Sequence, residues 1–328
     1  MENRQMEGKA TNQADRLLQG QRPERFEPAA LQFKDQRQVF SVHAGETPFL
    51  SFRALDETGL VQNSFSTRFG GVSEGYLSSL NFSFAKEGEQ RARVMENYCR
   101  MAKAMEVDAS RMVLSWQTHT TNVRLVTEAD CGKGIFRPRD YQDVDGLICN
   151  TPGITLVTLS ADCVPLYILD PIHKAIGLSH SGWRGTVKRM GAATIARMQE
   201  AFGSDPADLI CCIGPSICRD CFEVGGEVAA AFLESFGEAA RELITKDGVL
   251  LNEAALSHLR ETEEAALCRE KYHVDLWQAN VQVFLEAGVP KKQVIVTNLC
   301  TKCNSAQLWS HRAFGTRRGN LAGFLCLR

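Results

Sequence analysis

A series of short apolar segments between residues 112 and 179 constrains the fold more than any other feature of the chain. The segments are rich in β-branched and aliphatic residues, and Gly, Pro, Asn or Asp separates them, as is typical of strands that end in turns. Most connections are too short to hold the crossover helix that parallel neighbours need. We therefore expect sheets that are largely antiparallel or mixed. The segments read MVLSW, NVRLVT, DGLICN, ITLVTLS, VPLYILD and AIGLS.

On both sides of this series the apolar period becomes that of helices. Val94, Tyr98 and Met101 recur at steps of four and three, which predicts a helix within residues 87–105. The fold class that follows is α+β, with mixed sheets flanked by helices in a single domain over residues 47–328. Further helical segments lie at residues 186–202, 226–236, 252–267 and 274–288, and strand-like segments at residues 48–55, 63–71, 208–214, 293–300 and 321–327.

Residues 1–46 differ in composition from the rest of the chain. They are rich in Gln, Arg, Glu and Lys and hold few aromatic residues, so they bury too little apolar area to offset the entropy of ordering. We expect a flexible N-terminal extension there. The whole chain, with 44% hydrophobic and 23% charged residues, has the composition of a globular protein.

Charge and hydropathy limit the partners that we expect. The formal net charge of -2 provides no overall attraction for nucleic acid or anionic lipid. No segment is long and apolar enough to span a bilayer, and the N-terminus lacks the apolar core of a signal peptide. We expect a cytoplasmic protein whose partners include neither nucleic acid nor a membrane.

Three metal-capable side chains stand at the ends of predicted strands: His119 closes WQTH, Cys163 closes LSADC, and His180 closes LSH. A thiolate with two imidazoles suits Zn²⁺, and three protein ligands leave a fourth position for water or substrate, as in catalytic zinc sites. The residue types alone would equally fit packed, hydrogen-bonded side chains. Cys163 could also be the nucleophile of a cysteine hydrolase, with His119 or His180 as its base.

Two charged residues close to these positions could take part in chemistry. Asp162 precedes Cys163 and could act as a general acid or base, orient a ligand, or only bind backbone at a strand end. Arg184 lies in the motif SHSGWRG, ahead of a predicted helix, where it could bind phosphate together with the helix N-terminus. A structural salt bridge above Trp183 is an equal interpretation of Arg184.

Five motifs in the same order resemble those of the YfiH/LACC1 family, also called the multicopper polyphenol oxidoreductase or laccase family. The motifs are FSTRFGGVS, QTH, SADCVPL, HSGWRG and GPSICRDCFEVG. The resemblance implies a layered α/β/β/α sandwich. It also implies a zinc-dependent purine nucleoside enzyme that phosphorolyses adenosine, inosine, guanosine and S-methyl-5′-thioadenosine, and that deaminates adenosine.

Carried over position by position, the resemblance places the metal ligands on His119, Cys163 and His180. We expect Cys163 and His180, together with Asp162, to carry catalysis. Two positions depart from the family pattern, because Ser181 stands where Ala is common and Ala313 stands where an Arg is expected. The expected substrate-binding residues are Arg68, Asn81, Gln117 and Arg184.

Other metal chemistry is a weaker interpretation of this sequence. The H-x-E and P-C-x-x-C signature of zinc nucleobase deaminases is absent. None of the seven histidines lies two residues from another, whereas a multicopper oxidase needs such clustered pairs. A laccase-type copper oxidoreductase is therefore the alternative rather than the expectation, although Cu²⁺ would compete for the same ligands in vitro.

The chain also contains two CxxC pairs, Cys218 with Cys221 and Cys300 with Cys303. Two such pairs are typical of a closed structural zinc site, which would suit a non-enzymatic interaction protein. However, Cys221 lies where the family often carries a cysteine that is not a ligand. The sequence therefore favours buried thiols at these four positions over an accessory metal.

Overall fold

A computed structural model describes residues 25–86, 88–262, 267 and 269–328 of the protein. Two six-stranded mixed sheets form its body. In the first sheet only β4 and β7 are parallel neighbours, and in the second only the two outermost pairs are parallel. The first sheet has the order β1 (Phe40–His43), β2 (Phe49–Phe52), β3 (Val61–Ser66), β16 (Leu321–Leu327), β7 (Thr155–Ser160), β4 (Met112–Leu114). The second has the order β15 (Val294–Val296), β10 (Ile210–Ile213), β8 (Val164–Asp170), β9 (Ala175–Ser181), β6 (Gly146–Cys149), β5 (Val123–Leu125).

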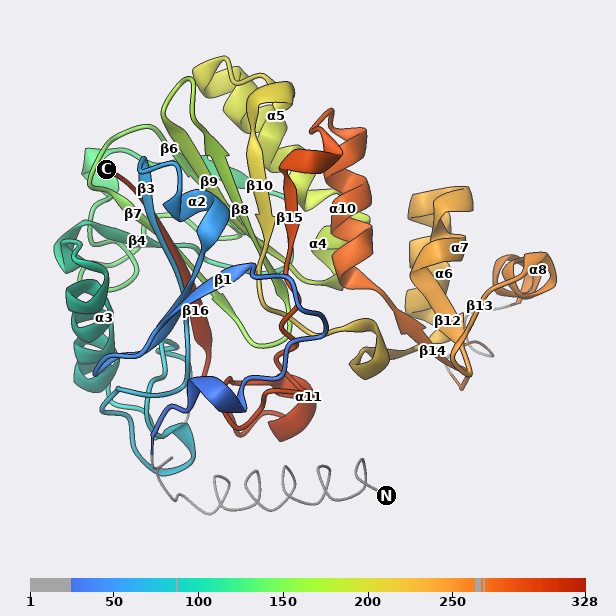
Figure 1. Cartoon of the computed structure of the whole chain (residues 1–328), viewed down its shortest axis with the longest axis horizontal. Helices are drawn as coiled ribbons and strands as arrows, with labels where there is room; N and C mark the ends of the chain where they lie inside the picture. Colours follow the sequence, from blue (N-terminus) through green and yellow to red (C-terminus); the bar gives the residue numbers. More distant parts are fainter. Residues whose placement is uncertain (1–24, 87, 263–266, 268) are drawn as a thin grey trace.

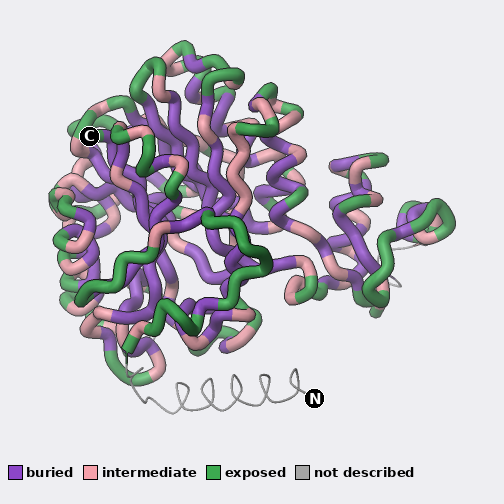
Figure 2. Tube along the Cα trace, viewed as in Figure 1, coloured by how far each residue is buried: buried purple, intermediate pink, exposed green. Residues whose placement is uncertain are grey.

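The two sheets pack face to face, and helices cover their outer faces (Figure 1). The hydroxyl of Tyr167 on β8 donates a 2.8 Å hydrogen bond to the carbonyl of Ser64 on β3, across the interface between the sheets. Helix α3 (Arg91–Met105) packs on the first sheet, whereas α5 (Met190–Phe202) and α10 (Leu276–Glu286) pack on the second. Figure 2 shows that the strands between these helices are mostly buried. The expected α/β/β/α layering is therefore confirmed.

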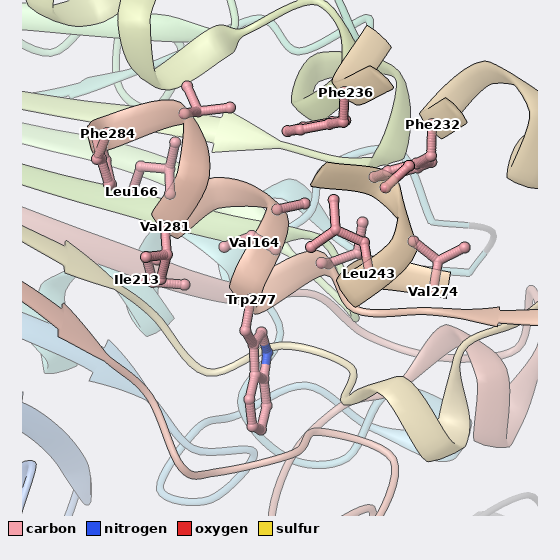
Figure 3. Close-up of a cluster of buried hydrophobic side chains, with 14 of the residues drawn as sticks. Val164, Leu166, Ile213, Phe232, Phe236, Leu243, Val274, Trp277, Val281 and Phe284 are labelled. Carbon is pink, nitrogen blue, oxygen red and sulfur yellow. The ribbon is translucent and has the colours of Figure 1, made fainter. Parts of the chain in front are cut away.

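A smaller lobe of helices and a third sheet projects from this body (Figure 1). Phe232 and Phe236 of the lobe belong to the same buried cluster as Val164 and Leu166 of β8, so lobe and body share a continuous core (Figure 3). The lobe contains β11 (Glu223–Gly225), α6 (Gly226–Phe236), α7 (Ala240–Leu243), β12 (Ile244–Lys246), β13 (Val249–Leu250), α8 (Glu253–Glu261) and β14 (Lys271–Val274). The remaining short helices are α2 (Arg53–Asp56), α4 (Trp183–Val187) and α11 (His311–Phe314).

The sheet of the lobe is the main element that the sequence did not predict. Its strands are two to four residues long and lie among helical segments, so no alternation of apolar and polar residues is long enough to be recognised. The body strands from β2 onward, in contrast, form where the apolar segments predicted them. None of the helices in the described residues has both the length and the apolar composition that crossing a bilayer requires.

The expected flexible extension covered residues 1–46, of which residues 1–24 lie outside the described residues. From residue 25 onward most residues of the segment are exposed, but Phe40–His43 form β1, which pairs antiparallel with β2 at the edge of the first sheet. Leu31 and Phe40 are buried there. The composition of the whole segment is polar, so these few apolar residues do not stand out in the sequence. The unpaired N–H and C=O groups at the edge of a sheet offer such a segment partners for pairing.

Candidate active site

The pairing of β8 with β9 brings two of the three predicted metal ligands together. The strands are antiparallel and Val164 lies opposite Ser181, so Cys163, just before β8, meets His180 near the end of β9. His119 reaches the same place from the loop that follows β4 of the first sheet. The ligand atoms of His119, Cys163 and His180 all lie within 4.8 Å of one another. We call this group the three-ligand centre.

The carboxylate of Asp145 orients both histidines of the three-ligand centre. One of its oxygens accepts a hydrogen bond of 2.9 Å from Nδ1 of His180, which leaves Nε2 of that ring for a metal or substrate. The same carboxylate accepts the backbone N–H groups of Thr118, His119 and Thr120 at 2.9 to 3.0 Å. These bonds hold His119 in a left-handed conformation, with φ 66°. Asp145 carries no functional signal in the sequence, because an Asp ahead of a strand is usual in any turn.

The charges at the three-ligand centre favour a thiolate. Burial alone would raise the pKa of Cys163, but the imidazoles of His180 and His119 lower it to about 6. Burial likewise would lower the pKa of His180, but the neighbouring Cys163 and Asp145 raise it to about 9. The thiolate is the form of cysteine that binds a metal or acts as a nucleophile.

Two residues of the three-ligand centre, His119 and Cys163, lie against Gly182 and leave no room for a side chain there. A Cβ atom at this position would lie 2.9 Å from Cδ2 of His119 and 3.0 Å from Sγ of Cys163, so only glycine fits. One sulfur and two imidazole nitrogens in such close proximity match the donor set of a tetrahedral metal ion with one open position. The residues present therefore fit a single divalent ion.

A pocket of about 320 Å³ opens on the three-ligand centre. Two aromatic side chains, Phe84 and Trp116, and two guanidinium groups, Arg139 and Arg318, line its walls. The other lining residues are Ser83, Ala85, Leu114, Ser115, Gln117, Leu159, Ser160, Ala161 and Asn320. A larger hollow of about 730 Å³ lies elsewhere and contains none of the residues predicted for catalysis.

Arg139 and Arg318 make the pocket suitable for an anion. Among the described residues, no carboxylate lies within ion-pair distance of either guanidinium. Arg139 lies 4.5 Å above the ring of Trp116, and Arg318 donates to Oδ1 of Asn320 at 2.6 Å. Burial lowers the pKa of both groups, and Nε of Arg318 has no hydrogen-bond partner among the residues that the structure describes. Sequence reasoning did not select either residue, because an Arg in a loop carries no signal of what faces it.

The predicted substrate-binding residues divide into two groups. Gln117 lines the pocket, where its carboxamide bonds to the backbone N–H and carbonyl of Leu159 at 2.8 and 2.6 Å. Asn81 is fully buried behind the wall, and its Oδ1 accepts the N–H groups of Ser83 and Asn320, both of which line the pocket. These two residues shape the pocket.

Arg68 and Arg184 lie outside the residues that line the pocket. Arg68 is completely buried, 3.7 Å above the ring of Trp309, and it donates to the carbonyl of Ser305 at 2.9 Å. Arg184 is exposed and lies 4.3 Å above the ring of Trp183. The proposed phosphate contact of Arg184 therefore has no support from the position of its side chain.

Asp162 is buried next to the three-ligand centre, but its carboxylate faces the C-terminal segment. Its oxygens accept hydrogen bonds from the hydroxyls of Thr301 and Ser310, at 2.5 and 3.1 Å, and from the N–H of Arg312 at 2.6 Å. Its φ of 85° is left-handed, which places a constrained residue directly before Cys163. This geometry suits the orienting role among those expected for Asp162.

The comparison with known families agrees with the motifs. The family model described as multi-copper polyphenol oxidoreductase laccase matches residues 62–328. The chain belongs to this family. Within the described residues, the groups whose ligand atoms converge are the three-ligand centre and the four cysteines Cys218, Cys221, Cys300 and Cys303, so there is no cluster of several histidines as in a multicopper site.

The chain is similar to two named proteins and to one protein of known structure. A protein of Bacteroides thetaiotaomicron named purine nucleoside phosphorylase is 33% identical over 83% of this chain and 93% of its own. A prokaryotic protein named adenosine deaminase RL5 is 31% identical over 71% of this chain and 81% of its own. The crystal structure of the hypothetical protein YfiH from Bacillus licheniformis has a TM-score of 0.78 and 26% identity, over 89% of this chain and 100% of its own.

Replacement of Gly182 tests whether the three-ligand centre binds a metal. We expect Gly182→Ala to weaken metal binding by at least about tenfold, because the new methyl group displaces His119 and Cys163. Gly185→Ala is the matched control in the same turn, since its Cβ would meet no atom closer than 3.5 Å. Competition with a chromophoric chelator measures both affinities. Equal affinities of Gly182→Ala and the wild type would show that the metal does not bind here.

Proposed function

We propose that the chain is a zinc-dependent purine nucleoside enzyme. Its expected reactions are the phosphorolysis of adenosine, inosine, guanosine and S-methyl-5′-thioadenosine, and the deamination of adenosine. The observation that carries this proposal is the meeting of the three-ligand centre with Arg139 and Arg318 in one pocket. The relatives named purine nucleoside phosphorylase and adenosine deaminase support the class of substrate.

Zn²⁺ is the ion that we assign to the three-ligand centre. One thiolate and two imidazoles are typical ligands of this borderline-soft ion, and the open fourth position is characteristic of catalytic sites. When bound, the ion supplies Lewis-acid chemistry for a water molecule or a substrate oxygen. Cu²⁺ outcompetes Zn²⁺ at most nitrogen and sulfur sites, so copper found in a preparation would not identify the native ion.

In phosphorolysis, an oxygen of inorganic phosphate attacks C1′ of the nucleoside while the bond from C1′ to the purine breaks. The products are the free purine and ribose 1-phosphate, or 5-methylthioribose 1-phosphate when the substrate is S-methyl-5′-thioadenosine. Arg139 and Arg318 would hold the phosphate, because guanidinium groups bind its oxygens bidentately and no carboxylate within the described part of the chain forms an ion pair with them. Phe84 and Trp116 provide apolar faces on which the purine can lie.

In deamination, water attacks C6 of adenosine and ammonia leaves, which yields inosine. Asp145 keeps the Nδ1 proton of His180 in place, so the opposite nitrogen of the ring faces the reacting groups. We assign Asp162 a positioning role, because its bonds to the C-terminal segment fix the turn that carries Cys163.

A cysteine hydrolase is a second candidate because of one specific observation. Cys163, His180 and Asp145 form a series of nucleophile, base and orienting carboxylate, and the pKa of the thiol is already lowered. Such an enzyme would need no metal. Dependence of turnover on Zn²⁺ therefore separates the two candidates.

The test is the analysis of products by HPLC. Purified protein of known zinc content is incubated with adenosine, with and without phosphate. We expect adenine only when phosphate is present, and inosine without it. Both products should be lost in Cys163→Ala, which removes a metal ligand, and kept in Cys99→Ala, which removes an exposed cysteine on α3. No turnover by the zinc-loaded wild type would contradict the proposal.

Replacement of Arg318 tests how phosphate is bound. Arg318→Gln should raise the KM for phosphate by about 10- to 100-fold, since hydrogen bonds to charged groups contribute about 1.5–3 kcal/mol each. Deamination of adenosine requires no phosphate and should change little. The neighbouring exposed Arg317, whose guanidinium lies 5.0 Å above the ring of Tyr76, provides the control Arg317→Gln. An unchanged KM for phosphate in Arg318→Gln would exclude this residue from the phosphate site.

A further inference from the structure

Four cysteines from two distant parts of the chain converge beside the body. Strands β10 and β15 are parallel neighbours, so the loops that follow them leave the sheet at the same edge. The first loop carries Cys218 and Cys221, and the second carries Cys300 and Cys303. We call these residues the four-cysteine cluster. All four sulfur atoms lie within 4.8 Å of one another.

The geometry of the four-cysteine cluster fits one tetrahedral ion. Zinc lies about 2.3 Å from each thiolate sulfur, which places neighbouring sulfurs of a tetrahedron about 3.8 Å apart. The sulfurs of Cys221 and Cys303 are 3.6 Å apart, which is close to this spacing and far longer than the roughly 2.05 Å of a disulfide.

Backbone hydrogen bonds also stabilise one sulfur atom of the cluster in the form that binds a metal. The N–H groups of Cys218 and Cys303 point at Sγ of Cys300, at 3.3 and 3.5 Å. An N–H group directed at sulfur stabilises the thiolate more than the thiol, because the thiolate carries the charge.

We propose that the four-cysteine cluster binds a second Zn²⁺ in a closed structural site, in addition to the ion of the three-ligand centre. Four protein ligands leave no open position, which is the mark of structural rather than catalytic zinc. The cluster does not line the pocket that opens on the three-ligand centre. This inference does not depend on the proposed function.

The structural ion would brace the turn that carries Cys163. The backbone between the two loops is joined, since the N–H of Thr301 donates to the carbonyl of Ser216 at 3.1 Å. Both loops then hold Asp162. The N–H of Ile217 donates to its carbonyl at 3.0 Å, and the hydroxyl of Thr301 donates to its carboxylate at 2.5 Å. The cluster is thus connected to the catalytic ligand through one residue.

The same ion would also anchor the lobe. Cys221 lies just before β11, the first strand of the lobe. The guanidinium of Arg312 donates to the carbonyls of Cys221 and Glu223 at 3.1 and 2.7 Å, while its N–H donates to Asp162. Loss of the ion should therefore loosen the lobe and the Asp162 turn together.

The experiment is a measurement of metal content by mass spectrometry on protein purified under reducing conditions. We expect about two zinc ions per chain in the wild type and about one in both Cys303→Ser and Cys163→Ala. Cys303→His should keep the second ion, because three cysteines and one histidine also form a closed zinc site. Cys211→Ser, at a buried cysteine of β10 outside both groups, is the control and should keep both ions.

Several outcomes would overturn the inference. Zinc content that is the same in Cys303→Ser and the wild type would do so, as would iron in place of zinc. If Cys303→Ser does not fold, Co²⁺ is added to metal-stripped Cys163→Ala, in which the four-cysteine cluster is the remaining site. The visible absorption of tetrahedral, thiolate-bound cobalt would support the proposal, and its absence would refute it. These results hold whether or not the protein turns over nucleosides.

Discussion

The carboxylate of Asp145 is the interaction on which the candidate active site depends. It is fully buried, and burial alone would raise its pKa, yet the hydrogen bond from His180 and the backbone N–H groups of Thr118 and Thr120 lower that pKa to about 2. The ionised group therefore ties the loop of His119, which follows a strand of the first sheet, to the end of β9 in the second. Without the carboxylate of Asp145, neither the loop of His119 nor the ring of His180 would be held in its present orientation.

Asp162 has the corresponding role on the other side of the three-ligand centre. Asp145 holds the histidines, whereas Asp162 fixes the turn before Cys163 through Thr301, Ser310 and the backbone of Arg312. The C-terminal segment that reaches Asp162 also supplies Arg318 to the pocket. The three-ligand centre and the wall of the pocket that holds Arg318 are therefore connected by the same short stretch of chain, and Cys300 and Cys303 of the four-cysteine cluster lie at the start of that stretch.

The sequence predicted the body strands from β2 onward, and the three residues that converge in the three-ligand centre, for physical reasons that are local. The strands β7, β8 and β9 are six or seven residues long and mostly apolar, and a His or Cys near the end of such a strand stands out against its apolar surroundings. Arg139 and Arg318 could not be found in this way, because only the folded chain shows that they line the pocket and that no carboxylate of the described residues pairs with them.

The remaining differences between the sequence-based expectations and the structure arise from the pairing of strands. Each CxxC pair is visible in the sequence, but the meeting of Cys218 with Cys300 follows from the parallel pairing of β10 with β15, some eighty residues apart in the chain. The sequence analysis therefore treated these cysteines as buried thiols. In the same way, the expected flexible extension of residues 1–46 includes Phe40–His43, whose place as a strand follows only from its pairing with β2.

The central claim is that turnover of nucleosides requires the metal of the three-ligand centre. The most direct measurement is to strip the wild-type protein of metal with a chelator and to return Zn²⁺ stepwise, while the phosphate-dependent release of adenine from adenosine is followed. The account predicts that turnover is lost on stripping and returns in proportion to the zinc bound at this centre. Full turnover by the stripped protein would contradict it.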